Sequence, residues 1–313
     1  MVYKTFLNQV AANIQMSLGE HCRVSLERVR KNNGLLLDGI CIEQPGELIA
    51  PTIYLNSYYQ EYEKGRPLEE ICHLVLETYW SRCSFPNLDP SMFRDFDRLR
   101  DKVVYRLINA QSNQELLDEI PYIPYLDLAV IFCIYLAENE KEQMTALIRN
   151  SHLKLWDITI QDLEECGAQN TPRLLPCTVK SLSQVIMESS SDPEEPLTQS
   201  PDFFDTKEDF YDFPLYVLTN QKNLYGAACI RYPDAIKNFA DSRNSDVLIL
   251  PSSIHEVLIT ADTPEVDYDL ISHIVFDINQ SDVPVEDRLS NQVYRYCRQD
   301  GSFSIVSHCP ESV

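Results

Sequence analysis

Strand-like segments occur in this chain as pairs joined by short polar turns, and this pairing constrains the fold more than any other feature. The clearest pair is RVSLERVR and LLLDGICIE, which flank the tight-turn dipeptide Asn33-Gly34. LAVIFCIYL and MTALIRN form another pair around the polar AENEKEQ. Parallel strands need long crossovers, so these short turns predict antiparallel hairpins and argue against a doubly wound parallel sheet.

Helical spacing accompanies the hairpins. Tyr3, Phe6, Val10 and Ile14 share one helical face, and Pro67 occupies a suitable first position for a helix. We therefore predict an α+β protein (mixed α/β), with hairpin-rich mixed sheets and helices packed on them. PLYVLTN and GAACIRY are expected to be strands before the helix PDAIKNFADS. This repeats the hairpin–helix order of the segment that starts at LAVIFCIYL, so a duplicated unit is a hypothesis.

The residue composition of the chain changes near residue 119. The run LAVIFCIYL is almost continuously apolar, as expected of a strand buried on both faces. We predict an N-terminal helix–hairpin–helix α/β part over residues 1–118 and a C-terminal α/β part over 119–313. The C-terminal part contains an acidic insertion at 188–208, expected to be mobile because its serines, prolines and carboxylates bury little apolar area.

Charge restricts the partners that the chain can have. Its net charge is −22, whereas nucleic acids and anionic membranes need a cationic surface, so neither is an expected partner. From Glu188 to Asp212 there are nine carboxylates and one lysine. A rigid acidic surface could also mimic DNA, and DNA mimicry is a third hypothesis for the function.

The cysteines and apolar runs indicate a cytoplasmic location. None of the ten cysteines forms a C-x-x-C pair, and several lie within apolar runs, where they behave as small hydrophobic residues. No apolar run approaches the roughly 20 residues that span a bilayer, and the first residues lack the pattern of a secretory signal.

Motifs for phosphate, nucleophile and metal chemistry are missing from the sequence. No G-x-G or G-x-S-x-G occurs, and no cofactor is predicted. His255-Glu256 begins like the zinc motif H-E-x-x-H, but Ile259 stands where the second histidine is needed. No metal site is predicted.

The stretch LPSSIHEVLIT, residues 250–260, allows two interpretations. In the first, a proline-directed turn with two serines leads into a strand, and His255 is a hydrogen-bonded structural residue. In the second, His255 is a base or ligand contact with Ser252 or Ser253 beside it, and a distant residue such as His152 completes the site. Successive strand residues point to opposite faces, so Glu256 is poorly placed to orient His255.

The sequence as a whole favours a non-enzymatic binding or interaction protein with an unknown protein partner. Its expected contacts are the aromatic residues of the acidic segment, namely Phe203, Phe204, Phe210 and Tyr211. The alternative is an unrecognised hydrolase or small-ligand-binding protein centred on His255.

Several phrases also resemble a known bacterial family. NSHLKLWDIT, FPLYVLTN, GAACIRYPDAIKNFA, SDVLILPSSIHEVLI and VYRYCRQDGSFSI together are similar to a domain of unknown function from anaerobic Gram-positive gut bacteria. Members of this family often occur near conjugative or other mobile elements. The resemblance implies a cytoplasmic bacterial protein accessory to a mobile element, and it brings no catalytic residues.

Overall fold

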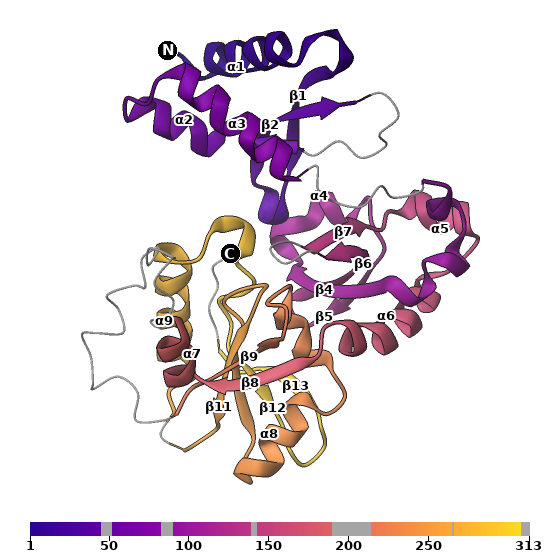
Figure 1. Ribbon diagram of the computed structural model, residues 1–313. Helices are drawn as coiled ribbons and strands as arrows, with labels where there is room; N and C mark the ends of the chain where they lie inside the picture. The colour runs from indigo at the N-terminus through magenta and orange to yellow at the C-terminus, as the bar shows by residue number, and fades with distance from the viewer. Residues whose placement is uncertain (45–51, 83–89, 139–142, 190–213, 265, 308–313) are drawn as a thin grey trace. The chain divides into compact units, whose positions relative to one another are not determined.

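The structured part of the chain consists of two compact units. The computed structural model describes residues 1–44, 52–82, 90–138, 143–189, 214–264 and 266–307 (Figure 1). The first unit comprises Met1–Arg98 with Leu136–Met144, and the second comprises Leu99–Tyr135 with Thr145–Val313. The predicted boundary between residues 118 and 119 lies inside the second unit.

The first unit is a small antiparallel sheet with helices. Strands β1 and β2 pair along their whole length, from Arg23 opposite Glu43 to Arg30 opposite Leu36, so the predicted hairpin is confirmed. Asn33 has a left-handed φ of 56° in the connecting turn, a conformation that asparagine tolerates well. The elements are α1 (Tyr3–Leu18), β1 (Arg23–Arg30), β2 (Leu36–Glu43), β3 (Thr52–Tyr54), α2 (Asn56–Glu63) and α3 (Leu68–Arg82).

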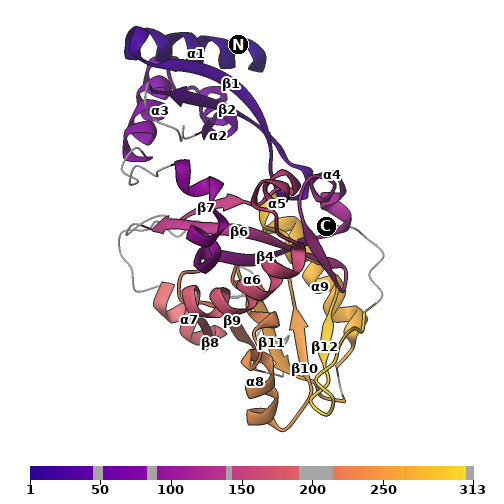
Figure 2. The ribbon, with the colours of Figure 1, turned by 90° about the vertical axis from the view of Figure 1, so that its right-hand side faces the viewer.

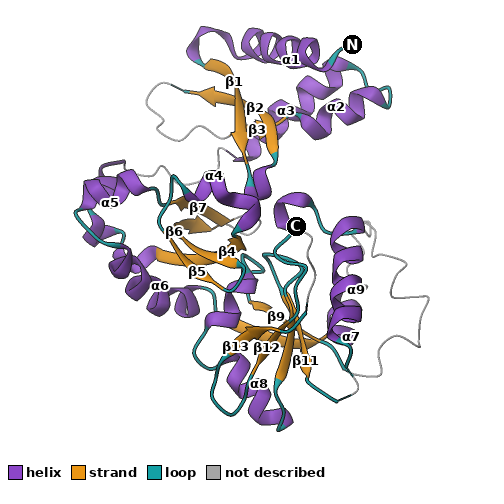
Figure 3. Cartoon of the chain, turned by 180° about the vertical axis from the view of Figure 1, so that it is seen from behind, coloured by secondary structure: helices purple, strands orange, loops and turns teal. Residues whose placement is uncertain are grey.

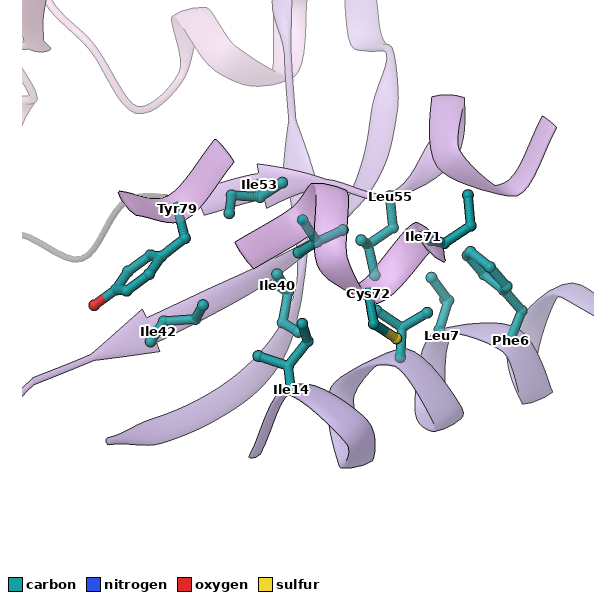
Figure 4. Close-up of a cluster of buried hydrophobic side chains, with 12 residues drawn as sticks. Phe6, Leu7, Ile14, Ile40, Ile42, Ile53, Leu55, Ile71, Cys72 and Tyr79 are labelled. Carbon is teal, nitrogen blue, oxygen red and sulfur yellow. The ribbon is translucent and has the colours of Figure 1, made fainter. Parts of the chain in front are cut away.

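The core of this unit lies between the sheet and its helices, as Figure 4 shows. The predicted apolar face of α1 is confirmed, because Phe6, Val10 and Ile14 are fully buried. They pack with Ile40 of β2 and with residues of α3 that recur at helical spacing, such as Ile71. Burial of an aliphatic or aromatic side chain stabilises a fold by roughly 1.5–3 kcal/mol, so this cluster holds the unit together.

The second unit contains two sheets, and the first is built around β6. Strand β6 pairs antiparallel with β4 and β5, and it also pairs with β7. Residues Leu128 to Ile134 of β6 are all buried, which confirms the prediction of a strand covered on both faces. Helix α6 packs on β4 (Figure 2), where Gly167 allows a close approach to the rings of Tyr105 and Phe132. The elements are β4 (Val103–Asn109), α4 (Gln114–Leu117), β5 (Tyr122–Tyr125), β6 (Leu128–Glu138), β7 (Gln143–Leu147), α5 (Asn150–Trp156) and α6 (Ile160–Leu174).

The second sheet has six strands in the order β13-β12-β10-β11-β9-β8, and every neighbouring pair is antiparallel. Strands β10 and β11 form an antiparallel pair, as do β12 and β13. The elements are β8 (Cys177–Ser181), α7 (Leu182–Ser189), β9 (Tyr216–Asn220), α8 (Ala235–Arg243), β10 (Val247–Leu250), β11 (Val257–Ala261), α9 (Tyr268–Ser281), β12 (Tyr294–Tyr296) and β13 (Phe303–Ile305).

Helices cover both faces of this six-stranded sheet (Figure 3). Leu248 of β10 packs against α9 through Ile271. The neighbouring residue Ile249 points to the opposite face and is in register with Ile259 and then Tyr216, whose ring contacts Phe239 of α8 at 5.1 Å between centroids. Hence α9 covers one face and α8 covers the other.

The expectation that GAACIRY is a strand is wrong. The segment forms the 3-10 helix η8 (Gly226–Arg231), with Gly226 to Ile230 all buried. Strand β9 already pairs with β8 on one side and β11 on the other, so it offers no free edge to a further strand. The second copy of the hypothesised hairpin–helix unit is therefore not formed, although the predicted α+β class is confirmed.

Some predictions concern residues outside those described. Phe203, Phe204, Phe210 and Tyr211 lie outside the described ranges, as does the insertion at 188–208 apart from the last two residues of α7. In the described ranges, no helix has the length and apolar character needed to cross a membrane. The same ranges contain no group of three or more histidine, cysteine or acidic residues that could hold a metal ion.

Candidate functional site

The loop that follows β10 is fixed by backbone hydrogen bonds on two sides. Strand β10 ends before Pro251, which cannot donate to a strand ladder. On one side, Ile254 N donates to Asp287 O over 2.8 Å and Leu289 N donates to Ser252 O over 2.9 Å. On the other side, Ala227 N of η8 donates to Ile254 O over 3.2 Å. The loop is therefore a rigid support for the side chain of His255.

Both ring nitrogens of His255 have partners. Nδ1 lies 3.2 Å from the carbonyl oxygen of Asn223, and Nε2 lies 3.3 Å from Oδ1 of Asp287 in the 3-10 helix η9 (Val285–Asp287). The Asn223 carbonyl oxygen only accepts hydrogen bonds, so Nδ1 must donate one. The Asp287 carboxylate is also an acceptor, so a protonated Nε2 suits it best. The geometry therefore suits a doubly protonated imidazolium that links two loops.

The electrostatics of His255 agree with this geometry. Burial of the ring opposes the charged form, but the hydrogen bond and charge of Asp287, the charge of Glu256 and the Asn223 carbonyl outweigh it. The pKa of His255 is therefore raised above its ordinary value. Burial also raises the pKa of Glu256, although a hydrogen bond with Ser253 opposes this rise.

A stack of charged and aromatic groups adjoins His255. The ring of Tyr225 stacks on His255 with 5.9 Å between centroids and 17° between planes, and the Arg106 guanidinium lies 4.5 Å from the centre of the same tyrosine ring. Cation–π contacts of this kind contribute about 0.5–2 kcal/mol. Arg106 comes from β4, which is otherwise almost wholly buried.

Among the described residues, no hydrogen bond joins a serine of the predicted site to the imidazole of His255. The hydroxyl of Ser253 accepts a hydrogen bond from the backbone N–H of His255 over 3.0 Å, so it shapes the turn. Ser252 contributes its carbonyl to the loop support described above. The structure thus brings Ser253 and Glu256 together beside His255, without a bond between a serine hydroxyl and a ring nitrogen among the described residues.

His152 has a different set of partners. It lies in the first turn of α5, where its Nδ1 accepts a hydrogen bond from Arg149 N over 3.1 Å and its ring packs on Trp156. Burial, together with the nearby charge of Arg149, lowers the pKa of His152. These contacts are typical of a helix cap, and none of them is shared with His255.

Sequence reasoning missed the residues that complete the His255 cluster, namely Arg106, Asn223, Tyr225 and Asp287. One signal was available in the segment VVYRLIN, since an arginine within a buried strand needs a specific partner. No local pattern in the sequence marks Tyr225 or Asp287 as members of this cluster.

A separate pocket of about 370 Å³ also lies within the second unit. Its walls come from the end of β5, from η8 and the start of α8, and from the β12–β13 hairpin. The lining residues are Tyr125, Ile230, Arg231, Tyr232, Pro233, Ile236, Lys237, Tyr296, Gly301 and Phe303. They include four aromatic rings and two cations, and none is acidic.

Arg231 is held firmly in the wall of this pocket. Its Nη2 lies 3.2 Å from Oε1 of Glu164, and its guanidinium lies 5.2 and 5.5 Å from the ring centres of Tyr105 and Tyr125. Phe303 contacts two further rings of the wall, at 6.0 Å from Tyr125 and 5.0 Å from Tyr296 between centroids. These contacts preorganise an aromatic surface around a fixed positive charge.

The hydroxyl of Tyr125 is the unusual feature of the pocket. It is buried and has no hydrogen-bond partner among the described residues. An unsatisfied buried polar group costs about 1–3 kcal/mol, so such groups are rare in folded proteins. Burial raises the pKa of Tyr125 to about 12, although the charge of Arg231 opposes this rise, so the hydroxyl stays protonated and able to donate.

Comparisons with known proteins place the chain in a family without assigning an activity. No curated protein and no solved structure matches it. Residues 3–298 match the model of a family of unknown function (DUF5688), and because this match covers nearly the whole chain, the protein belongs to that family.

Proposed function

We propose that this chain is a cytoplasmic, non-enzymatic binding protein, and that the pocket of the second unit takes a small molecule. The observation that carries the proposal is the buried Tyr125 hydroxyl, which lacks a partner that a ligand could supply. The pocket volume falls within the range of about 300–1,000 Å³ usual for ligand sites, and its aromatic lining is typical of them.

The state of His255 and the cysteines also support this proposal. Both ring nitrogens of His255 are engaged, which favours a structural role over that of a general base. In the described part of the chain, eight cysteines are free thiols, as a reducing cytoplasm would keep them.

The test is to purify the tagged full-length chain from its native cytosol and identify retained small molecules by mass spectrometry. We expect one compound in stoichiometric amount, and less of it with Tyr125→Phe. The matched control is Tyr122→Phe, on the same strand but exposed, which should retain the compound fully. If the wild type and both variants retain no small molecule, the proposal is wrong.

A protein partner is proposed for the acidic, aromatic segment 188–212. Its nine carboxylates and the aromatic residues Phe203, Phe204, Phe210 and Tyr211 would meet a basic partner with apolar pockets. The resemblance in sequence suggests that this partner belongs to a mobile element. Deletion of 188–212 should abolish capture of the partner from the native cytosol, and unchanged capture would disprove the assignment.

A hydrolase centred on His255 is the second candidate. The observation in its favour is the His255–Asp287 pair, since a carboxylate commonly orients a catalytic histidine. In this proposal Ser253 or Ser252 is the nucleophile, and His152 is the distant residue that completes the site. A fluorophosphonate probe should then label the wild type but not the Ser253→Ala or Ser252→Ala variant, and absence of labelling in the wild type would remove this candidate.

A further inference from the structure

One end of the pocket suits a negatively charged group. Pro233, Ile236 and Lys237 line it at the beginning of α8, a helix of nine residues. The first N–H groups of a helix point outward and carry partial positive charge, which favours anions. The N-cap residue Asp234 makes no side-chain hydrogen bond to these N–H groups, and it is not among the lining residues.

The charges of the lining strengthen this preference. The whole chain carries −22, yet the pocket is lined by Arg231 and Lys237 without any carboxylate. Arg231 is already paired with Glu164, whereas Lys237 is exposed on the first turn of α8. Lys237 is therefore the cation best able to meet a ligand, and Arg231 chiefly fixes the aromatic wall.

The other end of the pocket suits a flat ring. Phe303 contacts Tyr125 edge to face at 6.0 Å and Tyr296 in a tilted arrangement at 5.0 Å between ring centroids. An additional ring placed against such a group gains about 0.5–1.5 kcal/mol beyond its area burial. Tyr125 lines this pocket, and its buried hydroxyl has no hydrogen-bond partner among the described residues.

We propose that the pocket binds a small carboxylate or phosphate that is attached to a planar ring. The anionic group lies at the start of α8 beside Lys237, and the ring lies against Tyr125, Tyr296 and Phe303. This assignment rests on the proposed binding function and adds the chemical class of the ligand.

Two anionic probes and their neutral counterparts test the ligand class with the full-length chain by isothermal titration calorimetry. Phenylacetate is compared with phenylethanol, adenosine monophosphate with adenosine, and inorganic phosphate serves as the anion without a ring. We expect at least one ringed anion to bind about 10-fold more tightly than its neutral counterpart, and inorganic phosphate to bind more weakly. The two pairs distinguish a carboxylate from a phosphate ligand.

Three variants assign the binding to this pocket. Lys237→Gln should weaken binding of the anionic probe by about 5- to 10-fold and leave binding of the neutral probe unchanged. Lys154→Gln, at an exposed lysine of α5, should change the binding of neither probe. Tyr125→Phe should weaken binding by about 2- to 10-fold without lowering the melting temperature, because it removes an unsatisfied hydroxyl.

The outcomes separate this inference from the proposed function. If a neutral probe binds as tightly as its anion, if neither ringed anion binds, or if Lys237→Gln has no effect, the ligand class is wrong. The proposed function fails separately, when purification from the native cytosol yields no retained small molecule.

Discussion

The hydroxyl of Tyr294 donates a hydrogen bond to the carboxylate of Asp127 and so joins the two sheets of the second unit. Tyr294 lies fully buried in β12, and Asp127 immediately precedes β6. The hydroxyl of Ser290 donates to the other oxygen of Asp127 over 2.6 Å, and Asn109 Nδ2 of β4 donates to Leu289 O over 3.0 Å. This polar network links the two sheets of the second unit.

Replacing Tyr294 by phenylalanine should therefore destabilise the protein. The change leaves the ring in place but removes one donor from the buried side of Asp127, at a cost of about 1–3 kcal/mol in the free energy of unfolding. Urea unfolding measures the difference. Tyr122→Phe, at an exposed site, is the control and should lie within about 0.5 kcal/mol of the wild type. Equal stability of both variants would show that the network contributes nothing.

The ion pair between His255 and Asp287 should make stability depend on pH. The pKa of His255 is raised in the folded state, so the contribution is fully present below the ordinary value of 6.5 and is lost as pH rises through the raised value. Asp287→Asn should cost about 1–2 kcal/mol at pH 6 and clearly less at pH 8.5. Urea unfolding across this range measures the effect.

His152 provides a control, because its effect on stability should change with pH in the direction opposite to that of His255. Its pKa is lowered in the folded state, so its contribution is present at high pH and is lost as pH falls below the ordinary histidine value. His152→Asn should therefore remove a small loss of stability on acidification, whereas Asp287→Asn removes a gain. If both variants shift the pH profile in the same direction, the imidazolium assignment of His255 is wrong.

Gly226 should not tolerate a side chain. A Cβ atom there would lie 2.1 Å from Oγ1 of Thr219 and 2.3 Å from the carbonyl oxygen of His255, which are themselves hydrogen-bonded. Gly226→Ala should cost about 2–3 kcal/mol, because η8 must move away from the loop. Thermal or urea unfolding gives the value.

Gly167 is the matched control for this substitution. Its added Cβ would approach the Tyr105 ring at 3.2 Å, a contact that a small shift of the ring relieves. Alanine also favours a helix over glycine by about 1 kcal/mol, so Gly167→Ala should stay within about 1 kcal/mol of the wild type. Similar losses at both positions would contradict the close approach seen at Gly226.

Features that depend on neighbouring residues could be predicted from the sequence. Asn33 and Gly34 lie in the turn of the first hairpin, as predicted, and Thr159 and Asp162, which have the spacing of a capping box, form the reciprocal cap of α6. By contrast, GAACIRY has the composition of a strand, but β9 has no free edge to accept it, and this is settled only by the pairing of the whole sheet.

The candidate sites also depend on tertiary contacts that the local sequence does not predict. The sequence identifies His255 and the serines beside it, but it does not show that the ring nitrogens meet Asn223 and Asp287 instead of a serine. The pocket is still less visible, because Tyr125, Lys237 and Phe303 come from three separate parts of the chain. Such groupings follow from tertiary packing, which local periodicity does not encode.

Replacing Arg106 tests whether the positive charge beside Tyr225 stabilises the fold. Its Nε is buried without a hydrogen-bond partner among the described residues, and its guanidinium contacts the Tyr225 ring. Desolvation of a buried charge commonly offsets what the charge gains, so Arg106→Met should leave the free energy of unfolding within about 1 kcal/mol or raise it. Tyr225→Ala should cost about 2–3 kcal/mol, because the ring supports both Arg106 and His255.

Urea unfolding compares the two variants. A loss above about 3 kcal/mol for Arg106→Met would reveal a structural ion contact, as breaking a buried pair does. A neutral result would show that the desolvation of the guanidinium offsets what its contact with the Tyr225 ring contributes to stability.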